Sequence, residues 1–245
     1  MNSKQALAAA IAAFLAFGHP RLAEASKTVT SPNVTEGEIT MEVKGEYDVD
    51  DRPAIRGAWN SKVNIAHSFT SFWSSELETT VQQTGLSNAR MDFSSTDWKN
   101  KFQFTKEKDF GLDTGMRITY SKNTSGDQDS VEVKLLAAKT IGLTNHRVNL
   151  IGSRVVGNAP AHAVTWGFSW SSRYKISETF QPGFENYSTF GKIGNEQGFD
   201  KQDHRLGPVF YGRINDRVSY DAGYLVGLSH AAPDGTLKAI LKYKF

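Results

Sequence analysis

Hydrophobic and polar residues alternate strictly over the last eleven residues, 235–245, whose sequence is GTLKAILKYKF. One face of an extended chain then carries Leu237, Ala239, Leu241, Tyr243 and Phe245, and the other carries Lys238, Ile240, Lys242 and Lys244. Successive side chains of a β-strand point to opposite faces. The pattern therefore predicts a strand with one apolar face and one wet face.

Eleven further segments of about ten residues show the same alternation or a high density of β-forming residues. The twelve predicted strands are 38–47, 60–69, 72–82, 97–105, 110–121, 130–139, 147–156, 164–174, 179–190, 204–214, 217–228 and 235–245. The segment 147–156 is the least regular, because Arg154 falls on the same face as Val148 and Leu150. The sequence thus predicts an all-β protein.

The connections between these strands alternate in length. Short connections cover 70–71, 106–109, 140–146, 175–178 and 215–216, and longer ones cover 48–59, 83–96, 122–129, 157–163, 191–203 and 229–234. Short turns at one end and longer loops at the other are typical of transmembrane β-barrels. We therefore expect a single antiparallel up-and-down barrel of about twelve strands. An even strand count would place both termini at the short-turn end.

Two prolines argue against this strand count. Pro182 and Pro208 lie inside predicted strands, and proline has no N–H for the strand ladder. Each has a neighbouring glycine, Gly183 or Gly207, so a β-bulge at each position is one expectation. If both prolines end their strands, the barrel has ten strands.

The first 25 residues predict a signal peptide. Lys4 precedes an apolar run over residues 6–17, and Ala23-Glu24-Ala25 forms a small-residue site, so we expect cleavage before Ser26. Twelve apolar residues are too few to span about 30 Å of hydrocarbon. The expected organisation is a signal peptide over 1–25, a flexible polar lead-in over 26–35 and an outer-membrane barrel over 36–245.

Composition narrows the class of protein. The chain of 245 residues contains no cysteine, which excludes disulfides, thiol catalysis and cysteine-bound metal. Its mean hydropathy is −0.43, and it has no run of about 18 apolar residues, which excludes a helical membrane protein. Its net charge of +2 gives no reason to expect nucleic acid as a partner.

The same alternation would also suit a soluble periplasmic β-sandwich that binds a ligand, with the apolar stripes facing inward. The size of the aromatic residues favours the membrane barrel, because aromatic girdles mark the two membrane interfaces. The aromatic residues expected at the lipid interface are Trp73, Trp98, Trp166, Trp170, Tyr220, Tyr224, Tyr243 and Phe245.

The polar stripes predict a lumen of mixed charge. Its expected wall or constriction residues are Glu42, Glu76, Glu78, Lys99, Lys101, Arg117, Glu132, Lys134, Arg173, Glu185, Arg205, Arg213, Asp221 and Lys242. One hypothesis is a ladder of salt bridges that fills a narrow barrel. The other is a charged constriction that selects small solutes. The sequence leaves both open.

Strand neighbours predict how these charges pair. Glu76 and Glu78 are expected to face Lys99 and Lys101, and Glu185 is expected to meet Arg205 or Arg213. Closure of the barrel would bring the last strand beside the first. The pairs expected across that seam join Lys238, Lys242 and Lys244 to Glu38, Glu42 and Glu46.

A catalytic site has weak support in the sequence. His67 could reach Ser75 across a hairpin on the lipid face, which would suit a lipid-modifying enzyme, but no third residue orients the pair. The remaining histidines after the signal peptide lie at strand ends or in loops without metal-ligand spacing. We therefore expect no catalytic residues, no metal and no cofactor.

The signal peptide, the twelve alternating segments, the loop lengths and the terminal Phe245 together resemble small porin-like outer-membrane proteins of Gram-negative bacteria. The resemblance covers residues 26–245 and is one of architecture. It implies a passive channel or structural barrel surrounded by outer-membrane lipid and lipopolysaccharide. It also implies that the barrel-assembly machinery recognises the last strand. The oligomeric state stays open, as does the role of the motifs HRLGP at 204–208 and APDGT at 232–236.

Overall fold

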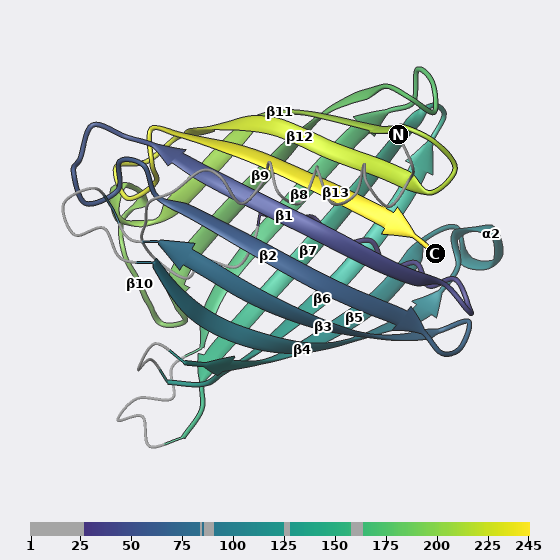
Figure 1. Cartoon of the computed structure of the whole chain (residues 1–245), viewed down its shortest axis with the longest axis horizontal. Helices are drawn as coiled ribbons and strands as arrows, with labels where there is room; N and C mark the ends of the chain where they lie inside the picture. The colour runs from purple at the N-terminus through teal and green to yellow at the C-terminus, as the bar shows by residue number, and fades with distance from the viewer. Residues whose placement is uncertain (1–26, 84, 86–90, 125–127, 158–163) are drawn as a thin grey trace.

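The computed structural model describes residues 27–83, 85, 91–124, 128–157 and 164–245, so the expected signal peptide lies outside it. Antiparallel strands follow one another around a barrel (Figure 1). The barrel strands are β1 (Ile39–Val49), β2 (Trp59–Ser68), β3 (Trp73–Gln83), β4 (Met91–Thr105), β5 (Asp113–Asn123), β6 (Ser130–Ile141), β7 (Thr144–Val155), β8 (Thr165–Tyr174), β9 (Gln181–Lys192), β11 (Asp203–Arg213), β12 (Val218–Gly227) and β13 (Gly235–Lys244). The expected all-β architecture with twelve strands is confirmed.

The sheet closes on itself because every barrel strand has two neighbours. β9 pairs with both β8 and β11, and β1 pairs with both β2 and β13. The seam between β1 and β13 runs from Thr40 opposite Lys244 to Val49 opposite Gly235. Closure leaves none of the twelve barrel strands at a sheet edge in the described structure. A soluble β-sandwich, which needs two packed sheets, is therefore wrong for this chain.

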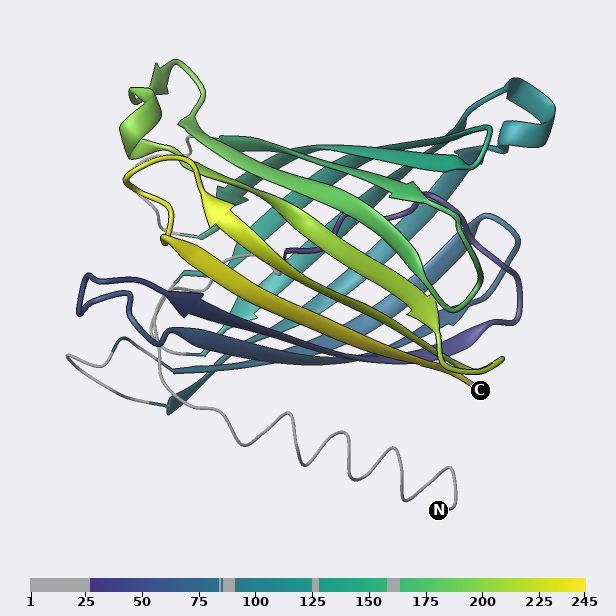
Figure 2. The same cartoon turned by 90° about the horizontal axis from the view of Figure 1, so that it is seen from above.

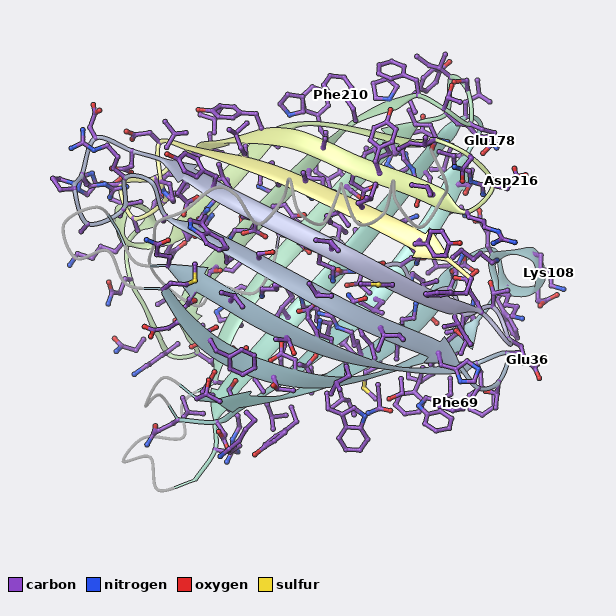
Figure 3. All side chains as sticks on the ribbon, in the orientation of Figure 1. Glu36, Phe69, Lys108, Glu178, Phe210 and Asp216 are labelled. Atoms are coloured by element: carbon purple, nitrogen blue, oxygen red, sulfur yellow. The ribbon has the colours of Figure 1, made fainter. Side chains whose placement is uncertain are left out.

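Long and short connections lie at opposite ends of the barrel, called here the loop end and the turn end. The turn end carries the connections 69–72, 142–143 and 214–217, together with Phe245. A short helix, α2 (Glu107–Phe110), lies there too. In Figure 3, Glu36, Lys108, Glu178 and Asp216 all lie at this end. The loop end carries a two-residue strand, β10 (Asn195–Glu196), and the 3₁₀ turn η2 (Phe199–Lys201).

The largest boundary difference is in β4. This strand begins at Met91, six residues before the predicted start at 97. Met91 and Phe93 are exposed on the outside, at 60% and 47%, but two consecutive serines, Ser94 and Ser95, hide the alternation in the sequence. The ladder between β3 and β4 also shifts register beside Val81.

Neither proline breaks its strand. Pro182 lies at the start of β9, beyond the last residue that pairs with β8, so its missing N–H removes no ladder bond there. Pro208 pairs with Phe184 on β9, whereas on the β12 side the ladder is interrupted at Gly207 and Pro208. The register is the same on both sides of that interruption. The β9–β11 register is likewise continuous through Pro182. The bulges expected at Pro182 and Pro208 are therefore wrong, and the alternative of ten strands is wrong as well.

The barrel is apolar outside and charged inside. Large hydrophobic side chains on the outer face are strongly exposed, among them Ile65 at 54%, Leu77 at 52% and Phe184 at 55%. Phe69 and Phe210 project from the outer surface in Figure 3. Lys44 and Glu78, which face the lumen, are only 3% and 1% exposed. This distribution suits a lipid environment, because a water-soluble barrel would bury its apolar face. Within the described residues, no helix has the length and apolar character required to cross a membrane.

Candidate functional site: the charged lumen

A dense network of ion pairs lines the lumen over β1–β4. The Nζ of Lys44 lies 2.9 Å from Glu78 Oε2 and 3.2 Å from Glu42 Oε2. The Nζ of Lys99 lies 2.7 Å from Glu78 Oε1 and 2.9 Å from Glu76 Oε1. Two cations thus hold three carboxylates, all on inward positions of neighbouring strands. Hydrogen-bonded charge partners are what allow such groups to be buried.

Ion pairs also join the two strands of the closing seam. Lys242 Nζ lies 3.4 Å from Glu42 Oε1, and Lys244 Nζ lies 2.6 Å from Glu38 Oε2. Both pairs are among those that the sequence predicts. Lys238 is opposite Glu46 in the register, but its ammonium extends across the lumen instead.

The partner of Lys238 is Glu185 on β9, at 2.5 Å. Tyr187 and Tyr211 each donate a hydroxyl hydrogen bond of 2.7 Å to the same carboxylate. The expected pairing of Glu185 with Arg205 or Arg213 is therefore not the one that forms. Arg213 lies at the turn end, exposed, 3.6 Å from Glu178.

Arg205 is the centre of a second buried cluster at the loop end. Its guanidinium donates to Asp203 at 2.7 Å, to Thr236 at 2.8 Å and to Asp48 at 3.2 Å. Arg205 belongs to the motif at 204–208 and Thr236 to the motif at 232–236. The two motifs therefore meet in space, and their contact ties β11 to β13 and β1.

A third cluster, centred on Arg52, joins the loop between β1 and β2 to the loop between β12 and β13, outside the membrane-spanning strands. Arg52 Nε donates to Asp50 Oδ1 at 2.8 Å, and Arg52 also donates to the carbonyl oxygens of His230 and Ala232. Asp50 is 4% exposed and accepts a further bond from the Asp234 backbone N–H. The hydrogen bonds from Arg52 hold the pKa of Asp50 below its ordinary value. The acidic residues of this loop thus serve as hydrogen-bond acceptors.

Residues 27–35 run inside the barrel as an extended segment, here called the lumen segment (Figure 2). The amide of Thr30 donates to Asn149 Oδ1 at 2.7 Å, and Asn149 Nδ2 returns a bond of 2.9 Å to the Thr30 carbonyl. Lys238 Nζ donates to the Lys27 carbonyl at 2.7 Å, and Lys101 Nζ donates to the Asn33 carbonyl at 2.7 Å. These contacts reach three separate strands around the wall.

The lumen segment also supplies apolar contacts. Val29, 5% exposed, belongs to a small apolar cluster inside the barrel. The other members are Tyr187, Val209, Tyr211 and Leu225. The segment therefore fills part of the bore with both apolar and hydrogen-bonded contacts. How flexible residues 26–35 are stays a prediction.

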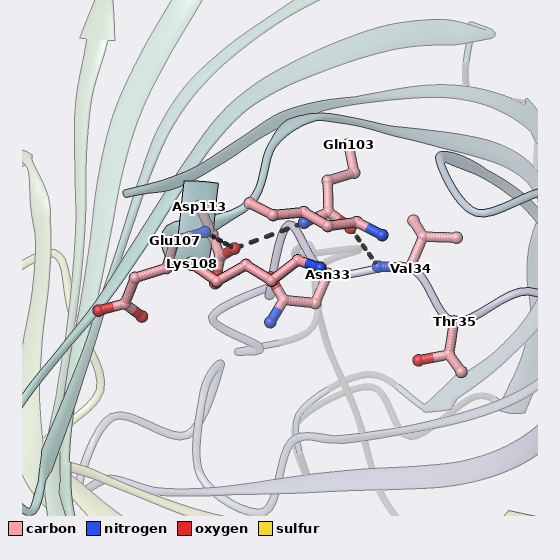
Figure 4. Close-up of a pocket in the computed structure, with 8 residues that line it drawn as sticks. Asn33, Val34, Thr35, Gln103, Glu107, Lys108 and Asp113 are labelled. Atoms are coloured by element: carbon pink, nitrogen blue, oxygen red, sulfur yellow. Dashed lines mark hydrogen bonds between the residues drawn. The ribbon is translucent and has the colours of Figure 1, made fainter. Parts of the chain in front are cut away.

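The lumen segment leaves the barrel at the turn end, because Lys27 lies near Asp203 on the loop-end side and Val34 lies near Gln103 at the turn end. Gly37 follows the segment with a φ of 75°, a left-handed conformation that glycine adopts without strain, and the chain then continues into β1. At the mouth, the Val34 amide donates to Gln103 Oε1 at 2.9 Å beside a cavity of about 560 Å³ (Figure 4). Asp113 accepts a hydrogen bond of 2.7 Å from the Glu107 amide, which fixes α2 at the same mouth.

A second cavity, of about 380 Å³, lies between the lumen segment and the barrel wall. Its lining is polar and includes both cations and carboxylates. The predicted lumen residues on its wall are Glu42, Glu76, Lys99, Lys101, Arg117, Arg173, Asp221 and Lys242. Arg147, which the sequence did not single out, lines it as well. Glu132 and Lys134 pair with each other at 3.5 Å on β6, and Glu132 also pairs with the cavity residue Arg117.

The expected interface aromatics all lie on barrel strands or at the chain end. They differ in their position along the barrel axis. At the turn end Tyr243 contacts Phe245, with ring centroids 5.0 Å apart. At the loop end Trp166 stacks on Phe190 at 4.3 Å. Other turn-end members are Trp73 and Tyr220, and Tyr224 lies at the loop end. Trp98 and Trp170 lie near the middles of β4 and β8.

The candidate enzyme residues form no catalytic arrangement in the described part of the chain. His67 is opposite Ser75 in the β2–β3 register, as expected, but Ser75 Oγ accepts a hydrogen bond from Trp98 Nε1 at 2.9 Å. His146 Nδ1 lies 2.6 Å from Ser172 Oγ without a third residue bonded to the ring. Across the described residues, no group of three or more potential ligands could hold a metal ion.

Comparisons with known proteins identify the fold. No protein-family model matches the sequence, and no curated protein matches it either. The crystal structure of the COG4313 outer membrane channel from Pseudomonas putida F1 is similar, with a TM-score of 0.64 and 10% identity over 92% of this chain and 100% of that chain. The NanC porin structure is similar with a TM-score of 0.60 and 8% identity, over 84% and 100%. The chain thus has the fold of a bacterial outer-membrane β-barrel.

Proposed function

We propose that this chain is a porin-like passive channel of the outer membrane for small hydrophilic solutes. The observation that carries the proposal is a closed barrel with an apolar outer face and a charged lumen, the reverse of a water-soluble protein. That lumen contains a cavity of about 380 Å³. A barrel of twelve strands is intermediate in width between small barrels filled by side chains and wide porins. The two structural neighbours, an outer membrane channel and a porin, support it.

In this proposal the lumen segment and the charged wall together set the bore. The loop end faces the outside and the turn end faces the periplasm, as in other outer-membrane barrels. Lipid and lipopolysaccharide surround the outer face, and the assembly machinery binds the last strand, β13. We infer no lipid-modifying activity, because neither His67 nor His146 belongs to a hydrogen-bonded triad in the described structure.

Planar-bilayer recording of the purified full-length mature protein tests the channel function. We expect stepwise conductance that scales with salt concentration, because ions cross a water-filled path. A buffer-only control excludes detergent artefacts. Membranes that stay silent after insertion of folded, heat-modifiable protein would contradict the proposal and favour a purely structural barrel.

A further inference from the structure

The lumen wall over β4–β6 carries cations that are only partly neutralised. Register places Lys101 opposite Arg117, and Arg117 opposite Lys134. Like charges directly opposite one another destabilise a sheet unless counter-charge is present. Glu132 is the carboxylate within reach, 3.3 Å from Arg117 and 3.5 Å from Lys134. One carboxylate thus serves two of the three cations.

Two arginines extend this positive wall onto β7 and β8. Arg147 is opposite Ser171, and Arg173 is opposite Asn145, so the two arginines are diagonal neighbours on the inward face. Both line the cavity of about 380 Å³. Among the described residues, neither guanidinium has a carboxylate within ion-pair distance.

Neutral groups hold both arginines in place. Arg147 Nε donates to Asn145 Oδ1 at 3.1 Å, which involves only one of its five N–H groups. The Arg173 guanidinium lies 5.0 Å from the centroid of the Tyr211 ring, a cation–π contact. These contacts orient the guanidinium groups but leave most of their donors for a ligand.

The nearby carboxylates of the protein compete only weakly with an anionic ligand for the two arginines. Glu185 is already bound by Lys238, Tyr187 and Tyr211. Asp221 lines the same cavity, and it forms no ion pair within the described residues. An anion that binds the arginines would therefore be opposed by one nearby carboxylate, Asp221.

We propose that Arg147 and Arg173 form a binding site for a small organic carboxylate in the lumen. The planar fork of a guanidinium matches a carboxylate in a bidentate manner, and two neighbouring forks can bind one ligand from two sides. A cavity of about 380 Å³ has room for such a solute. If the barrel is a channel, this site makes small organic carboxylates its substrate class. That conclusion about transport rests on the proposed channel function.

Calorimetric titration of the purified full-length mature protein with sodium succinate tests the site directly. We expect saturable binding, and we expect R147Q/R173Q to weaken it at least about tenfold by removing the donors. Asp221→Asn should strengthen binding, because it removes the opposing charge. The matched control is Arg213→Gln, an exposed arginine outside the cavity, which should bind succinate like the wild type.

Two results would overturn the site: no succinate binding by the wild type, or equal binding by folded R147Q/R173Q. If the double variant does not fold, the succinate affinity of Asp221→Asn becomes the test. Affinity equal to or weaker than that of the wild type would then overturn the site. A parallel bilayer recording separates the two proposals. Succinate binding by a protein that gives silent bilayers would contradict the channel function and leave the site intact, whereas conductance without succinate binding would do the reverse.

Discussion

At the residue scale, the lumen depends on cations that hold more than one carboxylate. Lys44 is 3% exposed and lies within 4 Å of Glu42, Glu76 and Glu78. Removing one member of a buried ion cluster leaves the others without compensation, which costs more than the pair itself contributes. Lys44 is therefore more important to stability than any exposed lysine of the chain.

We expect Lys44→Met to lower the free energy of unfolding by about 2 kcal/mol or more, because buried Glu78 then loses the ammonium that lies 2.9 Å from its Oε2. Urea unfolding in lipid vesicles, followed by tryptophan fluorescence, measures the change. Lys122→Met is the control: Lys122 is 63% exposed and pairs with Asp129 at the surface, so its loss should change the stability far less than Lys44→Met does. Adding Glu78→Gln to Lys44→Met should restore part of the loss, and equal stability of Lys44→Met and wild type would contradict this account.

The contact between Asp50 and Arg52 predicts a pH dependence at the loop end. A carboxyl whose pKa is lowered by folding contributes stability above its unfolded pKa of about 3.9, and this contribution is lost as the pH falls through the lower folded value. Residues 50–58 should therefore stay protected from hydrogen exchange at pH 7 and lose protection below about pH 4. Asp50→Asn should lose that protection already at pH 7. Asp51→Asn, at an exposed neighbour, should not, and identical exchange in both variants would argue against this contact.

At the scale of elements, the seam between β1 and β13 completes the barrel. The register and the ion pairs Lys242–Glu42 and Lys244–Glu38 agree with what alternation and closure predict. These pairs are partly exposed, so each contributes a fraction of a kcal/mol and mainly helps to fix register.

Charge reversal tests the seam register. The double change Lys242→Glu and Lys244→Glu should lower the free energy of unfolding by about 1–2 kcal/mol, and with it the urea midpoint, since it places like charges beside one another across the seam. Adding Glu38→Lys should recover part of that loss, because Glu38 pairs with Lys244, whereas Glu42 is left unchanged since it also contacts Lys44. Heat-modifiable gel mobility reports how much barrel forms. A triple variant that is no more stable than the double variant would contradict the pairing across the seam.

Strand positions could be predicted because a transmembrane strand has a strict two-residue period. Strand boundaries were predicted wrongly where that period fails, as at Ser94 and Ser95 of β4. The bulge at Pro208 was predicted wrongly because the ladder between β11 and β12 is interrupted there without a change of register. Partners across the lumen could not be predicted, because alternation specifies a face but not the reach of a long side chain. Lys238, for example, bypasses Glu46 and binds Glu185.

At the scale of the whole molecule, the lumen segment is the feature that the sequence concealed most completely. Residues 27–35 have no strand-like alternation, and a polar composition is equally typical of a lead-in. Their fit inside the barrel depends on groups from distant strands, such as Asn149 on β7 and Gln103 on β4. Val29 gives an apolar contact to the cluster inside the barrel that no local pattern indicates.

In the proposed function, the barrel is a channel whose bore is narrowed by the lumen segment. Single-channel conductance of the wild type and of a variant that lacks residues 27–34 measures this narrowing. Because the deletion removes chain from the lumen while β1–β13 keep their register, we expect small steps for the wild type and steps several-fold larger for the deletion variant. Equal conductance of the two folded proteins, or a silent wild type, would contradict the claim.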